Sequence, residues 1–245
     1  MAEEVRHELA LLGDPATAAQ LQRYFRTGPG QYGEGDRFLG VRVPLVRSLA
    51  RRYRALDLEQ CETLLRSPWH EVRLLALLVM VDACGRGDTG TRDGIRDVYL
   101  RNTDRVNSWD LVDVSAEHIV GPLVRRDGPS VLHRLARSGN VWERRIAIMA
   151  TYHLIKAGEV AETFRTAGLL LDDEHPLIHK ATGWMLREAG RRDLRALEMF
   201  LSRTYRRMPR TMLRTAIERL PPARRQAYLR GTVEPGVVPG KGGQS

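Results

Sequence analysis

Helical periodicity along almost its whole length is the feature of this chain that most restricts its fold. Segments such as VRLLALLVMVDA (72–83), RRIAIMATYHLI (144–155) and ATGWMLREAG (181–190) carry apolar residues three and four positions apart, the spacing of one helix face. No segment alternates apolar and polar residues convincingly, as a half-buried strand would. The sequence therefore predicts an all-α protein.

Helix-breaking residue pairs divide the chain into helical segments that come in twos. These breaks are Asp14-Pro15, Ser67-Pro68, Gly121-Pro122, Gly128-Pro129, His175-Pro176 and Pro221-Pro222. A paired-helix unit of about 35 residues lies in the period range of helical repeat proteins. The tetratricopeptide consensus is absent, whereas a basic residue followed closely by alanine, as at Arg145–Ala147, is typical of HEAT-like repeats.

We expect these repeats to form one curved HEAT-like solenoid, because each paired-helix unit buries its apolar face only against its neighbours. Residues that recur in register then share one surface, which we expect to be concave and basic. The predicted repeat domain covers residues 1–230. The segment 231–245 is rich in glycine and proline and is predicted to be disordered.

A charged residue recurs at intervals of 32 to 40 residues, in the first turns of successive helical segments. The five positions, here called the charged row, are Arg73, Asp113, Arg145, Lys180 and Arg214. Basic residues in one row suit a polyanion, whereas a carboxylate among them weakens its binding. Asp113 therefore serves another purpose, either chemistry or an ion pair with an arginine of a neighbouring repeat.

The residues just before Asp113 indicate how its helix begins. We expect Asn107 to cap the helix N-terminus, with Asp110 completing the cap and matching the helix dipole. That role accounts for Asp110 but not for Asp113, which lies one turn deeper. Trp109 precedes Asp113 by four residues and is therefore its neighbour on the helix surface.

Two further tryptophans lie in the second helices of predicted repeats. We expect Trp142 to fill the core between repeats. Trp184 follows Lys180 by four residues and shares its helix face. Aromatic rings beside cationic side chains favour contact with a nucleotide or a sugar over packing.

Composition limits the possible partners and the cellular location. The net charge of +9 and the pI of about 10.1 favour an anionic partner, most simply nucleic acid. No apolar run approaches the ~20 residues of a membrane span, and the N-terminus lacks the regions of a signal peptide. We expect a cytoplasmic monomer that binds no membrane. Cys61 and Cys84 lie in apolar helical contexts and are predicted to be buried free thiols.

Two motifs suggest cofactor or metal chemistry but lack the context that this chemistry needs. The segment 28–33, GPGQYG, matches GxGxxG but follows a helical segment instead of a strand, so a dinucleotide site is excluded. We interpret it as a surface loop and leave its contact with DNA open. His175 and His179 are four residues apart, but no third ligand is evident. We expect no metal and no cofactor.

Several segments together resemble one known family. They are Tyr24, TGPGQYGEGDRFLGVRVP (27–44), SWDLVD (108–113), NVWERR (140–145) and KATGWMLRE (180–188). They resemble the AlkD-type DNA alkylation repair family, whose members are HEAT-like-repeat glycosylases that remove alkylated purines from double-stranded DNA. The matches are spread from about residue 20 to residue 215, and their combination is specific to that family.

The resemblance assigns roles to five residues of this chain. It implies that Asp113 is the catalytic carboxylate, that Trp109 and Trp184 contact the deoxyribose of the lesion, and that Arg145 binds neighbouring phosphates. It also places Tyr24 at the DNA surface. We expect further DNA contacts at Lys180, Arg187, Arg144, Arg73, Arg47, His179 and Arg214. A close relative carries a lysine where this chain has His153.

The implied reaction needs few catalytic groups. N3- or N7-alkylation makes a purine cationic, so breaking its glycosidic bond releases a neutral base without a general acid. One carboxylate then stabilises the positive charge that develops on the sugar and orients the attacking water. The sequence leaves open a non-catalytic DNA-binding or damage-sensing protein and a protein-binding scaffold. It also does not decide whether the substrate carries simple methyl or bulky adducts. Nor does it decide whether the biological role is general repair or self-resistance to an alkylating antibiotic.

Overall fold

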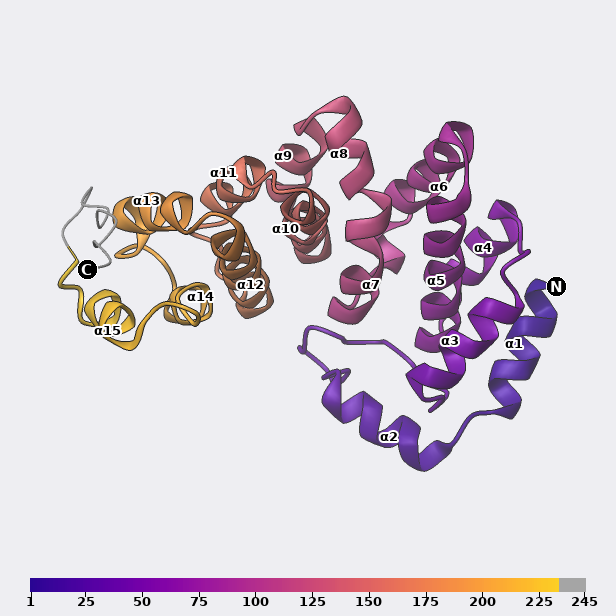
Figure 1. The fold of residues 1–245 in the computed structure, drawn as a ribbon. Coiled ribbons are helices and arrows are strands. Elements are labelled where there is room, and N and C mark those ends of the chain that lie inside the picture. The colour runs from indigo at the N-terminus through magenta and orange to yellow at the C-terminus, as the bar shows by residue number, and fades with distance from the viewer. Residues whose placement is uncertain (234–245) are drawn as a thin grey trace. The chain divides into compact units, whose positions relative to one another are not determined.

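A computed structural model describes residues 1–233. Within that range the chain forms fifteen α-helices and one 3-10 helix, without a β-strand (Figure 1). The prediction of an all-α helical-repeat fold is confirmed. The contacts between helices separate two compact units, Met1–Val120 and Gly121–Ser245, where the sequence predicts one continuous repeat domain.

Unit 1 is built around the long helix α5. Its elements are α1 (Ala2–Leu11), α2 (Pro15–Tyr24), α3 (Val43–Arg52), α4 (Leu58–Leu65), α5 (His70–Arg86), α6 (Thr89–Arg101), η1 (Thr103–Arg105) and α7 (Trp109–Ile119). Helices α1, α3, α4, α6 and α7 all pack on α5. Leu75, Leu77 and Met80 are therefore buried on different sides of this helix. Cys61 and Cys84 are buried free thiols, as predicted.

Unit 2 has two central helices, α10 and α12. Its elements are α8 (Gly121–Asp127), α9 (Ser130–Ala136), α10 (Val141–Lys156), α11 (Ala161–Leu169), α12 (Pro176–Arg192), α13 (Leu194–Thr204), α14 (Arg210–Ala216) and α15 (Pro222–Arg230). Helix α10 packs on α8, α9, α11 and α12, and α12 also packs on α13 and α14. Each first helix of a pair thus covers one side of a buried second helix, as expected of a repeat array.

The beginning of the predicted tail is packed against unit 2. The Tyr205 hydroxyl donates hydrogen bonds to the carbonyls of Gly231 (3.1 Å) and Val233 (2.8 Å), and the Val233 side chain is buried. The rest of the segment predicted to be disordered, 234–245, lies outside the described residues. Over residues 1–233, no helix is long and apolar enough to cross a membrane. The same residues contain no cluster of three or more His, Cys, Asp or Glu suited to a metal ion.

Candidate functional site

Helix α7 begins at Trp109, and its first turn differs from the expected cap. The N-cap residue is Ser108, which has extended backbone geometry and makes no side-chain capping bond. The prediction that Asn107 and Asp110 cap the helix is wrong. Asn107 Oδ1 instead accepts a hydrogen bond from Arg73 Nη2 (3.1 Å), and Asp110 Oδ2 lies 2.9 Å from His70 Nε2. Both side chains therefore tie α7 to α5.

Four charged side chains form a cluster between α5, the loop before α3 and the first turn of α7; Asp36, His70 and Arg73 are buried, and Asp110 is part-buried. His70 Nδ1 lies 2.7 Å from Asp36 Oδ2, and Arg73 Nη2 donates to Asp36 Oδ1 at 2.7 Å. Burial disfavours the charged imidazole, but hydrogen bonds to Asp110 and Asp36 raise the pKa of His70 to about 9. Burial also opposes ionisation of Asp36, but the hydrogen bond from His70 and the charge of Arg73 hold its pKa below the ordinary value. The imidazole is therefore a cation near neutral pH, between two carboxylates.

Aromatic rings connect this cluster to Trp109. Phe38 stacks on the His70 ring with centroids 4.4 Å apart, and Phe25 lies 5.1 Å from the same ring. Phe25 also stacks on Trp109, with centroids 5.3 Å apart and an interplanar angle of 15°. Tyr24 meets Trp109 edge-on at 6.1 Å, and its own side chain is 66% exposed. The half-buried Trp109 is thus fixed on one side by packing, which is a suitable state for a ring that contacts a ligand.

Asp113 lies one turn after Trp109 and is half-buried. It follows the N-cap of its helix by five residues. Basic residues occupy the same position in four other helices. They are Arg47 in α3, Arg145 in α10, Lys180 in α12 and Arg214 in α14, after the N-caps Arg42, Asn140, His175 and Pro209. We call these five residues the fifth-position register. Asp113 is its acidic member.

Arg73 does not belong to this register, so the charged row expected from the sequence combines two sets of residues. Arg73, Arg144 and His179 each follow their N-cap by four residues. Each contacts the carbonyl six residues earlier in the chain, as in the bonds from Arg73 Nη1 to Ser67 O (3.0 Å) and from Arg144 Nη1 to Ser138 O (3.0 Å). These side chains therefore close the loop in front of the helix.

This position decides what Arg73 can do. Its side chain is 3% exposed and is paired with Asp36, so no surface remains for a phosphate. A contact of Arg73 with DNA stays a prediction, and it requires the buried pair with Asp36 to open. Arg144 is only part-buried, but its Nε donates to Asp173 Oδ2 at 2.6 Å. Both arginines serve loop structure in this state of the protein.

The remaining predicted residues of unit 2 differ in exposure. Lys180 and Arg214 are exposed. Arg145 is 4% exposed, and its Nη1 donates to Leu177 O at 2.8 Å. Arg187 is partly buried and pairs with Glu188 and Glu218. The structure thus leaves two of these four cations available at the surface.

Trp184 is half-buried, and its ring lies beside that of Tyr152. The two ring centroids are 6.4 Å apart with an interplanar angle of 44°. The Tyr152 ring also contacts Lys156, whose Nζ atom lies 4.9 Å from the ring centroid. In contrast, Trp142 is buried in unit 2, as expected for a core residue. The structure therefore distinguishes Trp184 from Trp142 by exposure.

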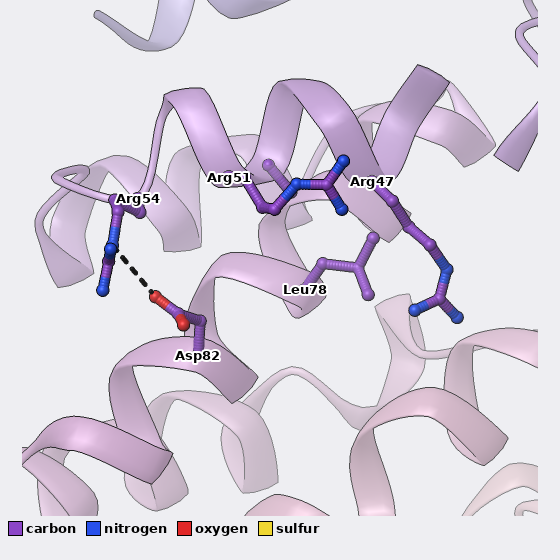
Figure 2. A pocket seen from close by; sticks show the side chains of 6 residues that line it. Arg47, Arg51, Arg54, Leu78 and Asp82 are labelled. Carbon is purple, nitrogen blue, oxygen red and sulfur yellow. Dashed lines mark ion pairs between the residues drawn. The ribbon is translucent and has the colours of Figure 1, made fainter. Parts of the chain in front are cut away.

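Arg47 lines a small surface pocket in unit 1 (Figure 2). The pocket has a volume of about 260 Å³ and lies between α3 and α5, with Ala50 and Leu78 as its apolar lining. Arg54 and Asp82 close one end by an ion pair of 3.5 Å. Among residues 1–233, the side chains of Arg47 and Arg51 form no hydrogen bond or ion pair. Two unpaired guanidinium groups at one pocket are suited to an anion such as phosphate.

Sequence reasoning missed the buried cluster and the aromatic rings that support Trp109. Asp36 lies in segment 27–44 and His70 lies 34 residues later, outside every motif, so only the fold brings the two side chains together. Tyr32 lies in segment 27–44, which resembles the repair family, and Phe25 lies just before that segment, but nothing in the sequence indicates that either residue supports Trp109. The Tyr32 hydroxyl donates to the carbonyl of Tyr24 (3.5 Å), and the Tyr24 ring in turn meets Trp109 edge-on.

The fold and the site define a class, an all-α helical-repeat protein with a basic register and one acidic exception. The family described as DNA alkylation repair enzyme matches residues 5–220, and this chain belongs to that family. A solved structure described as a predicted DNA alkylation repair enzyme from Enterococcus faecalis is similar in fold, with a TM-score of 0.66 and 17% identity. The match covers 86% of this chain and 97% of that one. No curated protein matches the chain.

Proposed function

We propose that this member of the family is a monofunctional DNA glycosylase that hydrolyses the N-glycosidic bond of cationic N3- or N7-alkylated purines. The observation that carries the proposal is the position of Asp113. It is the acidic member of an otherwise basic register and lies one turn from a tryptophan that aromatic packing fixes in place. A carboxylate at such a point weakens DNA binding, and in a glycosylase it would act on the positive charge that develops on the sugar.

Asp113 would act on the sugar and not on the base. An alkylated purine already carries a positive charge, so it leaves as a neutral molecule and the charge moves to the deoxyribose. The Asp113 carboxylate would stabilise that oxocarbenium-like sugar and orient the water that attacks it. The electron-rich faces of Trp109 and Trp184 would stabilise the same cation. No metal or cofactor is required for this step.

Exposed cations and one exposed aromatic ring would bind the DNA backbone. In unit 1 these are Arg47, next to the pocket shown in Figure 2, and Tyr24. In unit 2 they are Lys180 and Arg214. The proposed role of Arg145 in binding phosphate requires its guanidinium to leave Leu177 O when DNA binds. Acting on cellular DNA, the protein would work as a cytoplasmic, nucleoid-associated monomer.

An excision assay tests this function directly. Wild-type protein is incubated with methylated DNA, and free 3- or 7-methylpurine is measured by chromatography alongside DNA affinity. Asp113→Asn is expected to bind DNA but release little base. Asp104→Asn changes an exposed aspartate of the same unit and is the matched control, with wild-type release. Tight binding without base release by the wild-type protein would instead favour a non-catalytic damage sensor.

A further inference from the structure

The buried charges behind α7 are unusual enough to require a function. Burying polar and charged groups costs free energy unless they are fully paired. Asp36, His70 and Arg73 are each less than a tenth exposed, and they connect a loop, α5 and α7. An apolar core would stabilise this unit equally well, so the cluster is better explained by a need for a fixed geometry than by stability.

The cluster is electrically balanced only when His70 is protonated. Asp36 and Asp110 contribute two negative charges, and Arg73 contributes one positive charge. The imidazolium supplies the second positive charge and donates from both ring nitrogens, to Asp36 at 2.7 Å and to Asp110 at 2.9 Å. The adjacent Glu71 does not compete, because it accepts the backbone N–H groups of residues 39, 40 and 41.

Asp110 depends on this histidine. Its Oδ1 atom is buried and has no hydrogen-bond partner among the described residues. Its Oδ2 atom is bonded to His70, so the carboxylate depends on that single bond. Asp110 lies in the first turn of α7, between Trp109 and Asp113. A loss of the bond to His70 therefore leaves a buried carboxylate unsatisfied at the start of the proposed catalytic helix, and the turn has to move to rehydrate it.

The loop before α3 supports the same turn from a second side. Asp36 lies in this loop and holds His70, while the Tyr32 hydroxyl donates to the carbonyl of Tyr24 (3.5 Å), whose ring meets Trp109 edge-on. Phe25, which precedes the loop, packs on both His70 and Trp109. The GPGQYGEGD segment thus contacts the side chains that fix Trp109, which gives this loop a use that does not involve phosphate.

We propose that His70 is a positioning residue: by bridging Asp36 and Asp110 it locks the first turn of α7 and so sets Trp109 and Asp113 for the reaction. This inference rests on the proposed function. His70 itself touches no substrate. The segment from residue 28 to Asp36 acts as a brace of the catalytic helix.

The first test replaces the imidazole by a neutral amide. His70→Gln is expected to lower the single-turnover rate of base release roughly 10- to 100-fold, the scale of a small misplacement of catalytic groups. Affinity for DNA is expected to stay within about twofold, because no phosphate contact is lost. His133→Gln is the matched control, since His133 also pairs with a carboxylate, Glu162 at 3.2 Å, but lies in unit 2. It is expected to act like the wild type.

A pH profile separates positioning from a merely structural role. The pKa of His70 is raised to about 9, so the wild-type rate should fall as the pH rises through that value. The rate of His70→Gln should not fall in this pH range. If His70→Gln does not fold, Asp110→Asn carries the test, because it removes the charge that makes the imidazolium necessary. An unchanged rate and an unchanged profile in the folded variant would overturn the inference.

The fluorescence of the free protein distinguishes a failure of this inference from a failure of the proposed function. Raising the pH through about 9 should change the tryptophan emission in the wild type, and Trp109→Phe should remove that change. This signal needs neither DNA nor catalysis. If the wild-type protein releases no base while the signal is present, the glycosylase assignment fails and the brace stands. If the signal is absent, the brace fails.

Discussion

The first turns of α7 in unit 1 and of α10 in unit 2 use the same scaffold position in opposite ways. In α10, Asn140 caps the helix through the Trp142 N–H, the tryptophan is buried, and the fifth position is Arg145. In α7 the side-chain cap is missing and the fifth position is Asp113. The first turn of α10 is therefore stabilised by its own side-chain cap. The first turn of α7 has no such cap and depends on the charged cluster of Asp36, His70 and Arg73.

If the proposed function holds, one repeat carries a reactive group at the helix position where its sister repeats carry a binding group. The backbone of the repeat would then fix the position, and the side chain would decide whether that position attracts phosphate or stabilises a sugar cation. The cost of the reactive version is visible in its supports, because α7 needs Asp36 and His70 from distant segments. Helix α10 needs only its own Asn140.

The largest effect on base release is expected when Asp113 is replaced by arginine, the kind of residue that the sister repeats carry at this position. Asp113→Arg should abolish base release, and Asp113→Asn should lower it at least ~100-fold through loss of electrostatic stabilisation. The arginine variant should also bind DNA more tightly and show a steeper salt dependence, because one more cation faces the phosphates. Base release and salt-dependent affinity are measured on the same methylated duplex. A wild-type rate in either variant would remove Asp113 from the mechanism.

Exchanging the two tryptophans for smaller residues should separate function from packing. Trp142→Ala is expected to destabilise the protein by about 3–5 kcal/mol, as is usual for a large buried aromatic side chain. Trp109→Ala should cost less stability, because that ring is half-buried, yet it should lower base release more than tenfold. Denaturant unfolding and single-turnover excision give the two readouts. Equal losses of stability would mean that Trp109 is a core residue.

Stability should depend on pH through His70. The folded-state pKa is about 9, above the ordinary value of 6.5, so the stabilisation is complete below pH 6.5 and is lost as the pH rises to about 9. The wild type is expected to lose a few kcal/mol of unfolding free energy over this window, and His70→Gln much less. Urea unfolding at pH 6.5 and pH 9.5 checks the difference. A parallel loss in both proteins would show that other groups titrate.

The smallest effect is expected at the pocket beside α3. Arg47→Ala combined with Arg51→Ala should lower DNA affinity and reduce the slope of log affinity against log salt by about 1 to 2. Arg192→Ala with Arg195→Ala removes the same charge from exposed positions and should leave the slope nearer to that of the wild type. Fluorescence anisotropy over a salt series gives both slopes. Identical slopes for the two double variants would show that only net charge matters.

The sequence was sufficient for the fold class and for the residues that are exceptional within a repeat. Periodicity decides the helices, and Asp113 is conspicuous because its sister positions are basic. The sequence was not sufficient to separate two registers one residue apart. Arg73 and Arg145 look equivalent along the chain, but the loop in front of α5 places Arg73 at the fourth position, where its side chain donates to the carbonyl of Ser67 in that loop.

Long-range contacts account for the rest of what sequence reasoning missed. The capping role expected for Asp110 was reasonable locally, because an acidic side chain in a first turn usually matches the helix dipole. The structure gives that carboxylate a stronger partner in His70, 40 residues earlier in the chain. A charged partner inside a core outweighs a local backbone bond, and no local pattern reveals it.

The aromatic rings and charged side chains that support Trp109 also limit which parts of this protein could be moved into another protein with the proposed activity. A shortened protein that starts at α3 would retain every member of the fifth-position register, and it would lose Phe25, Tyr32 and Asp36. Grafting the sequence of α7 into another helical array would fail for the same reason. On the proposed function, Asp113 and its supports therefore need the whole of residues 1–120 in addition to Trp184 of unit 2, and a design that copies α7 without these supports should yield an inert DNA binder.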